Sequence, residues 1–428
     1  MKRKIEAQLL NWKSKKQRMP LLIKGARHVG KTYIVREFGK RYFKNTIYLD
    51  FETDRDAASF FGDDISPQKL LRRLESYTGQ QIVPGETLVI FDEIQFCNRA
   101  LTSLKYFCED APEYHIVAAG SLMGFPVNPE HYSFPVGRVE MLELHPLDFE
   151  EYLWARGKEQ LANEIKQAYR DMSPLPENLH QEAVQLYNEY LIVGGMPASD
   201  TIFLETGDFS SVPAALSGIT DSYTADIAKY ASPIENSKIE VCYRSIPAQL
   251  VKGNKTFPHK VAQQNGDGTQ LDTAIQWLSF AGMVLKNQRI TQAYEPLAAY
   301  ADFSSFKLYL NDVGLLATKL GLSHQSILSG KCGISLDAIA ENYVAQQFAA
   351  KGHSLYYWYN EDADVDFVLQ KDNEIIGVAI VMSENDGKQT FDVFTRTYNT
   401  AYNIYLSTKN FSKYNGLKFI PLYAAFCI

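Results

Sequence analysis

Cysteine is scarce in this sequence, with five among 428 residues. The five are odd in number, widely separated and never spaced as CxxC: Cys97, Cys108, Cys242, Cys332 and Cys427. Disulfide frameworks and structural zinc sites both need paired or clustered cysteines. The sequence therefore indicates neither of them, and it predicts a protein of the reducing cytoplasm.

Long hydrophobic runs are also missing. No stretch is long enough to span a bilayer, and the apolar run that follows Lys2, Arg3 and Lys4 covers only Ala7 to Leu10, too short for a signal peptide. We therefore expect no membrane partner. A net charge of −7 argues against nucleic-acid binding by the whole surface, although a local basic face stays open. Apolar residues make up 46% of the chain, and its length predicts a globular protein of about three domains.

A phosphate-binding loop is the strongest motif present. The octapeptide GARHVGKT fits the pattern Gly, four residues, Gly, Lys, Thr; an apolar strand, Leu21 to Ile23, precedes it, and an amphipathic helix follows. Backbone N–H groups of such a loop and the positive end of the helix dipole bind phosphate oxygens. Lys31 would reach the β- and γ-phosphates, and the Thr32 hydroxyl would bind Mg²⁺. The predicted nucleotide-binding residues of the loop are Gly25, Ala26, Arg27, His28, Val29, Gly30, Lys31 and Thr32.

Two adjacent carboxylates form the second signal. The apolar run Leu88 to Phe91 ends on Asp92 and Glu93. A carboxylate at the end of a core strand is where phosphate-loop NTPases place the acid that holds Mg²⁺. We assign that role to Asp92, and we assign Glu93 as the base that orients or deprotonates the attacking water. The pair predicts hydrolysis as well as binding.

Three further polar residues have open roles. Ser121 follows the apolar run that ends near Ala119, so it either contacts the γ-phosphate or the water, or belongs to a simple turn. Arg138 either stabilises charge in the transition state, in its own chain or in a neighbouring subunit, or forms a structural ion pair. Arg27 either contacts phosphate or braces a neighbouring acid.

The first 155 residues predict an α/β domain. Apolar or β-branched runs at 46–51, 87–91, 114–119 and 139–144 alternate with helical stretches and join the strand at 21–23. Such alternation predicts a parallel sheet that is covered on both faces and binds its ligand at the carboxyl ends of the strands.

Taken together, the motifs resemble a known family. The stretches GARHVGKT, LVIFDEIQ, AAGSLMG, FPVGRVEMLELHPLDFEEYL and YLIVGGMP, followed by DSYTADIAKYAS, SFKLYLNDVGLLA and GISLDAIAENYVAQQF, are similar to bacterial and archaeal AAA-type ATPases that carry a conserved C-terminal domain of unknown function. The resemblance covers nearly the whole chain. It implies ATP and Mg²⁺ as ligands, with Lys31, Thr32, Asp92 and Glu93 in the roles given above, and preference for adenine rests on it alone.

We divide the chain into a P-loop ATPase domain (1–155), a helical linker or lid (156–235), a winged-helix-like domain (236–320) and a restriction-endonuclease-like α/β domain (321–428). Residues 161–193 predict two helices, and Gly194, Gly195 and Pro197 mark a turn or hinge after them. Predicted helices at 239–250, 258–264 and 269–281, with strands at 284–290 and 297–300, match the order of a winged helix. Residues 237–292 carry a net charge of about +4. This segment therefore either binds DNA or serves as a packing or protein-binding module.

The last hundred residues look like the core of restriction-endonuclease-like folds. Glu341, Asp364 and Asp366 stand where the first metal-binding acids of such nucleases would be. The following strand carries Ala379 and Val381 where the remaining acid and the lysine are needed. Neither side chain can bind a metal or position a hydroxide, so we predict that this domain does not cleave DNA.

The sequence thus predicts an ATP hydrolase that acts as a nucleotide-driven switch on a macromolecular partner, with DNA, another protein or further copies of the chain as candidates. The alternative is an interaction protein that holds ATP without hydrolysing it.

Overall fold

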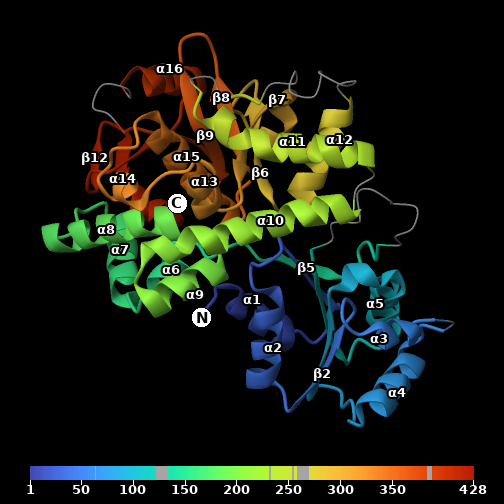
Figure 1. Cartoon of the computed structure of the whole chain (residues 1–428). Helices are drawn as coiled ribbons and strands as arrows, with labels where there is room; N and C mark the ends of the chain where they lie inside the picture. Colours follow the sequence, from blue (N-terminus) through green and yellow to red (C-terminus); the bar gives the residue numbers. More distant parts are fainter. Residues whose placement is uncertain (63, 122–133, 231–232, 253–254, 258–268, 383–387) are drawn as a thin grey trace.

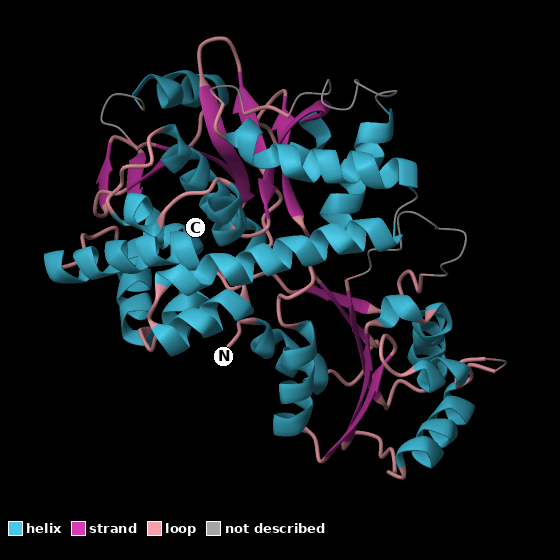
Figure 2. Ribbon diagram, in the orientation of Figure 1, coloured by secondary structure: helices cyan, strands magenta, loops and turns pink. Residues whose placement is uncertain are grey.

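The computed structural model describes the chain except residues 63, 122–133, 231–232, 253–254, 258–268 and 383–387. Figure 1 and Figure 2 show two sheets, one in the N-terminal part and one in the C-terminal part, with a group of helices between them. No helix among the described residues has the length and apolar character needed to cross a bilayer.

The N-terminal sheet has five parallel strands in the order β2-β3-β4-β1-β5. The strands are β1 (Leu21–Lys24), β2 (Asn45–Asp50), β3 (Thr87–Asp92), β4 (His115–Gly120) and β5 (Glu140–Glu143). All five predicted strands are confirmed to within a residue or two at most ends. Because the strands are parallel, their carboxyl ends meet at one edge, and the phosphate-binding loop follows β1 at that edge.

Helices cover both faces of this sheet (Figure 1). Neighbouring strand residues point to opposite faces. Ile23 and Leu88 therefore belong to one core with Phe38, whereas Leu22 and Val89 belong to another with Leu104. The first face is covered by α1 (Ile5–Ser14) and α2 (Lys31–Tyr42), and the second by α3 (Arg55–Ser59), α4 (Pro67–Thr78), η1 (Ile94–Phe96) and α5 (Asn98–Asp110).

The middle of the chain is helical. It contains α6 (Phe149–Ala155), α7 (Glu159–Asp171), α8 (Glu177–Val193), α9 (Pro197–Thr206), η3 (Phe209–Ser211), α10 (Val212–Tyr230), α11 (Pro233–Leu250) and α12 (Thr269–Phe280). The two helices predicted within 161–193 are confirmed as α7 and α8. The helix predicted at 239–250 is longer, and the one predicted at 258–264 lies outside the described residues.

The glycine turn after α8 packs tightly on the N-terminal domain. Gly194 has a φ of 72°, and a Cβ on Gly195 would lie 2.0 Å from the Leu147 carbonyl oxygen. The Leu147 amide donates to the Gly195 oxygen at 2.7 Å, and the Gly195 amide donates to Asp312 at 2.6 Å. Only glycine permits this close approach of two backbones.

The C-terminal sheet has eight strands in the order β12-β13-β11-β10-β9-β8-β6-β7. They are β6 (Val284–Ile290), β7 (Ala301–Leu310), β8 (Tyr356–Tyr359), β9 (Asp364–Lys371), β10 (Glu374–Ile380), β11 (Asn403–Ser407), β12 (Ser412–Tyr414) and β13 (Leu417–Pro421). The helical elements of this part are η5 (Leu297–Tyr300), α13 (Val313–Lys319), α14 (His324–Leu328), α15 (Ile334–Ala350), α16 (Lys388–Tyr398) and η6 (Leu422–Cys427).

One sheet joins two segments that the sequence assigns to separate domains. Strand β6 pairs with β7 on one side and with β8 on the other. The hairpin expected to be a wing is therefore continuous with the C-terminal strands, across the predicted boundary at 320/321.

The strand predicted at 297–300 is wrong. These residues form the short helix η5, and the strand that pairs with β6 begins at Ala301. Pro296 opens the helical turn, because its carbonyl accepts the Ala299 amide at 3.0 Å. The Leu297 amide donates to the Gln370 side chain at 3.2 Å, so it has no need of a strand partner.

Candidate nucleotide-binding site

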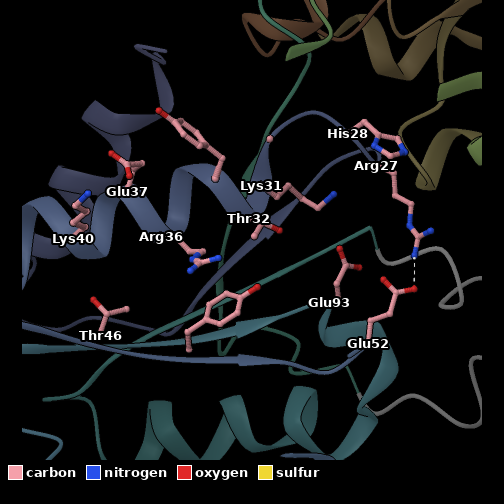
Figure 3. A pocket seen from close by; sticks show the side chains of 13 residues that line it. Arg27, His28, Lys31, Thr32, Arg36, Glu37, Lys40, Thr46, Glu52 and Glu93 are labelled. Atoms are coloured by element: carbon pink, nitrogen blue, oxygen red, sulfur yellow. Dashed lines mark hydrogen bonds and ion pairs between the residues drawn. The ribbon is translucent and has the colours of Figure 1, made fainter. Parts of the chain in front are cut away.

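A cleft of ≈ 890 Å³ opens at the carboxyl edge of the N-terminal sheet. The phosphate-binding loop, helix α2, strand β2 and the segment after β3 all contribute to its walls (Figure 3). Its lining residues are Arg27, His28, Gly30, Lys31, Thr32, Tyr33, Arg36, Glu37, Lys40, Thr46, Tyr48, Glu52 and Glu93.

The loop adopts a conformation that its glycines permit. Gly30 has a φ of 95° and precedes the first residue of α2, while a Cβ on Gly25 would lie 2.2 Å from the Leu144 carbonyl oxygen. No side chain caps the amino end of α2. Its first amides and the positive end of its dipole are therefore directed at the cleft, where they suit an anion.

Lys31 is buried in the loop. Its Nζ donates to the carbonyl oxygens of Gly25 at 3.0 Å and Ala26 at 2.8 Å. Burial lowers the pKa of Lys31 to about 8, and the nearby carboxylates of Glu93 and Asp92 partly offset this effect. The ammonium is thus held among the atoms that would surround a phosphate.

Asp92 and Glu93 lie at the end of β3, facing the loop. The buried Asp92 carboxylate accepts the Tyr48 hydroxyl at 2.9 Å and the Glu93 amide at 3.0 Å. Glu93 has a φ of 49°, a left-handed conformation that is uncommon outside glycine. Burial raises the pKa of the Glu93 carboxyl, and Lys31 opposes that shift. Figure 3 shows the Lys31, Thr32 and Glu93 side chains directed into one space.

The donor set suits a nucleotide triphosphate with magnesium. Mg²⁺ is typically held by one or two protein oxygens together with phosphates and waters. Thr32 and Asp92 are the oxygen donors that the sequence predicts for this role, and among the described residues no cluster of three or more His, Cys, Asp or Glu side chains offers a complete protein cage. Polyphosphate and water would have to supply the other ligands.

Helix α10 braces the loop from the helical middle. Arg27 forms an ion pair with Asp226 at 2.7 Å and a longer one with Glu52 at 3.3 Å. His28 lies 2.9 Å from the Ser222 hydroxyl, and the Tyr223 hydroxyl donates to the Arg27 carbonyl oxygen at 3.2 Å. Of the two roles left open for Arg27, these contacts match the bracing of an acid.

Ser121 and Arg138 lie in different places. Ser121 follows β4 at the carboxyl edge, and its buried hydroxyl has no hydrogen-bond partner among the described residues. Arg138 precedes the amino end of β5, which aligns with Leu21 at the opposite edge of the sheet from the loop. It is half-exposed and pairs with Glu109 at 3.1 Å. The structure therefore does not bring Arg138 to the cleft of its own chain.

Sequence analysis missed four residues that shape the site. Tyr223 and Asp226 belong to the stretch DSYTADIAKYAS, whose resemblance to the family was the available signal. Gln95 donates to Glu93 at 2.5 Å and stands two residues after it. Arg3 donates to the Val29 carbonyl oxygen at 3.1 Å, and no local sequence pattern predicts this contact.

The acids predicted in the C-terminal domain are held by lysines. Glu341 on α15 accepts hydrogen bonds from Lys255, from Lys307 at 2.9 Å and from the Tyr309 hydroxyl at 2.6 Å. Lys307 also lies 3.7 Å from Asp366. Burial opposes ionisation of Glu341, yet the two lysines hold its pKa at about 2. Burial and the Glu341 charge raise the pKa of Asp366 to about 6.

The rest of this predicted site offers little to a metal. Asp364 is exposed, and the Asp366 carboxylate accepts the Ile380 amide at 2.9 Å, between the two positions that lack polar side chains, Ala379 and Val381. Lysines thus supply the positive charge that a metal supplies in an active nuclease.

Three family models match parts of the chain. An AAA domain matches residues 17–153, and two domains of unknown function, DUF8612 and DUF4143, match residues 184–326 and 336–425. No curated protein matches.

Several solved structures are similar at low sequence identity. The Walker-type ATPase of Pyrococcus abyssi is 16% identical, over 74% of this chain and 95% of its own, with a TM-score of 0.44. The ORC1 protein of Aeropyrum pernix, solved in complex with DNA, is 14% identical over 77% of this chain and 93% of its own, with a TM-score of 0.29. The ORC2 protein of the same organism, in its ADP form, is 14% identical over 78% and 93%, with a TM-score of 0.32.

The AAA model covers the strand, loop, helix and carboxylates whose geometry is described above. Residues 17–153 are therefore an AAA-type P-loop ATPase domain.

Proposed function

We propose that the protein binds ATP with Mg²⁺ and hydrolyses it, and that the nucleotide state acts as a switch on a macromolecular partner. The observation that carries this proposal is the convergence of Lys31, Thr32 and Glu93 on one cleft, at the amino end of α2. The buried Asp92 carboxylate lies behind the cleft and accepts the hydroxyl of the lining residue Tyr48. The contacts of the loop with α10 support the switch, because a movement of the loop would shift α10 in the helical middle of the chain.

Each residue has a distinct proposed role. The loop amides from Gly25 to Thr32 and the Lys31 ammonium bind the phosphates, while Thr32 and Asp92 hold magnesium. When bound, magnesium neutralises charge that develops on the phosphates. Glu93 orients the attacking water and accepts its proton, as its raised pKa suits a general base. Ser121 contacts the γ-phosphate or this water through its buried hydroxyl, which has no hydrogen-bond partner among the described residues.

Arg138 acts, in this proposal, across an interface with a second copy of the chain. Its position at the far edge of the sheet argues against a role in its own cleft, and its exposure suits contact with a neighbour. An arginine supplied by a neighbouring molecule can stabilise the charge of the phosphoryl transition state.

Phosphate release from ATP tests the proposal. Lys31→Ala should abolish nucleotide binding or hydrolysis, and Glu93→Gln should still bind ATP while its kcat falls by about 10²-fold or more. Glu143→Gln, a carboxylate on edge strand β5 outside the cleft, is the control and should keep wild-type turnover. Wild-type hydrolysis no faster than that of Glu93→Gln would favour the alternative, an interaction protein in which ATP is a structural ligand.

The nature of the partner is a separate question. Residues 237–292 have a net charge of about +4, but Arg244, Lys255 and Arg289 pair with acids within the chain. With DNA as the partner, the full chain should shift a duplex probe with an affinity that falls steeply with salt. A salt-independent or absent shift would favour a protein partner. The isolated segment is unsuitable, because its hairpin shares a sheet with β8.

We further propose that the C-terminal domain is not a nuclease and that the protein acts in the cytoplasm. Purified protein with Mg²⁺ or Mn²⁺ should leave plasmid DNA intact. Two lysines bind the Glu341 carboxylate, and position 379 is an alanine, whose side chain cannot bind a metal. Metal-dependent nicking that Asp366→Ala abolishes and Lys31→Ala does not would contradict this expectation.

A further inference from the structure

Gln95 is a buried glutamine whose side chain reaches the proposed catalytic carboxylate. It lies in η1, directly after β3, and is 5% exposed. Its Nε2 donates to Glu93 Oε2 at 2.5 Å. Glutamine is seldom buried unless its amide is used, and here the amide donor is used on Glu93.

The neighbouring strand leaves room for this side chain. A Cβ built on Gly120, the last residue of β4, would lie 2.4 Å from Gln95 Oε1. Any larger residue at position 120 would therefore displace the Gln95 carboxamide. The left-handed turn at Glu93 brings the two side chains, which are two residues apart, to the same side of the chain. The backbone of β3, η1 and β4 thus fixes the pair.

We propose that Gln95 is the positioning residue of the hydrolysis reaction: it fixes one oxygen of the Glu93 carboxylate and leaves the other to the attacking water. This inference rests on the proposed function. Glu93 Oε1 accepts no hydrogen bond from the described residues, so it is the oxygen open to water. Gln95 Oε1 is also buried without a partner in the described part of the chain, and a water beside Glu93 could donate to it.

Two variants test the role. Gln95→Met keeps an unbranched side chain of similar length without a donor, and Gln95→Glu keeps the shape but adds a second carboxylate. For both, kcat for ATP should fall at least tenfold while KM for ATP changes less than threefold.

Gln288→Met is the matched control. Gln288 on β6 is 8% exposed and donates to two backbone carbonyl oxygens, of Asp302 and, at 2.9 Å, of Ser305, far from the cleft in the chain. Its loss should lower the melting temperature without changing kcat for ATP. If Gln95→Glu fails to fold, Gln95→Met alone gives the kcat and KM readouts.

The outcomes are distinguishable. Unchanged kcat in Gln95→Met, with Glu93→Gln still inactive, would overturn the role of Gln95 and leave the ATPase proposal standing. Parallel changes of kcat and KM, matched by Gln288→Met, would show a structural residue only. Wild-type protein that binds ATP without turnover would overturn the proposed function and the role of Gln95 with it.

Discussion

At the scale of single residues, the least usual feature is the buried ammonium of Lys31. Its hydrogen bonds go to the carbonyl oxygens of Gly25 and Ala26, and burial brings its pKa to about 8. A triphosphate would add negative charge beside this ammonium, which the nearby carboxylates of Glu93 and Asp92 only partly supply. Binding should therefore require the charged form of Lys31.

This requirement predicts that nucleotide affinity depends on pH. Below pH 8 the free protein already carries the ammonium, whereas above it the ammonium must first be formed, so affinity is lost as pH rises. The Kd for a non-hydrolysable ATP analogue should increase about tenfold between pH 7 and pH 9. Calorimetry at constant ionic strength measures it, and proton uptake should approach one per nucleotide at pH 9 and be near zero at pH 7. Constant affinity without proton uptake would contradict the expectation.

At the scale of elements, α10 links the nucleotide site to the C-terminal sheet. The Tyr223 hydroxyl donates to the Arg27 carbonyl oxygen at 3.2 Å and accepts from the Asn311 amide at 3.2 Å. Asn311 directly follows β7 and precedes Asp312, which binds the Gly195 amide. One hydroxyl therefore connects the loop, a long helix and the end of a strand in the second sheet.

Removal of the Tyr223 hydroxyl should lower the free energy of unfolding. Tyr223→Phe removes two hydrogen bonds, one to the Arg27 carbonyl oxygen and one from the Asn311 side chain, which predicts a loss of about 1–3 kcal/mol in urea unfolding. Tyr343→Phe is the matched control, because Tyr343 is equally buried but its hydroxyl has no partner among the described residues. That change should be neutral or slightly stabilising. Equal losses of unfolding free energy in the two variants would mean that the hydrogen bonds of the Tyr223 hydroxyl contribute nothing to stability.

Some of the strands, helices and site residues could be predicted from the sequence, and others could not. The five strands of the first sheet were predictable, because each is a short apolar run whose buried residues face both covered sides. That Lys31, Thr32 and Glu93 would lie at one cleft was predictable for a similar reason, because the loop after β1 and the acids after β3 follow parallel strands of one sheet. The contact of Tyr223 with Arg27 joins residues 196 apart, and no local pattern encodes it. The helix at 297–300 was missed because these residues were expected to form a strand, whereas Pro296 begins a helical turn there.

At the scale of the whole molecule, the nucleotide site lies where three parts of the chain meet. The loop contacts Arg3 at the N-terminus, Tyr223 on α10 and the turn between α12 and β6. In that turn, a Cβ built on Gly282 would lie 2.9 Å from the Ala26 amide nitrogen. The loop cannot shift far on binding a nucleotide without moving this turn, and β6 lies inside the eight-stranded sheet. We therefore expect a shift of the loop on nucleotide binding to reach the C-terminal sheet through this turn.

Gly282→Ala tests this connection. Gly282 has a φ of 71°, and an added methyl group would press on the loop at Ala26, so the affinity for an ATP analogue should fall about tenfold, equivalent to 1.4 kcal/mol. Gly321→Ala is the control: its φ of 67° imposes a similar backbone strain, but its Cβ would meet no atom within 4 Å. Both variants should lose stability, since both place an alanine in the left-handed conformation, and Gly282→Ala should lose more because its methyl group also meets the backbone of Ala26. Only Gly282→Ala should lose affinity, because only there does the methyl group reach the loop. Equal affinity of the two variants would mean that the loop adjusts independently of the turn, and the second sheet would then have to sense the nucleotide through α10 alone.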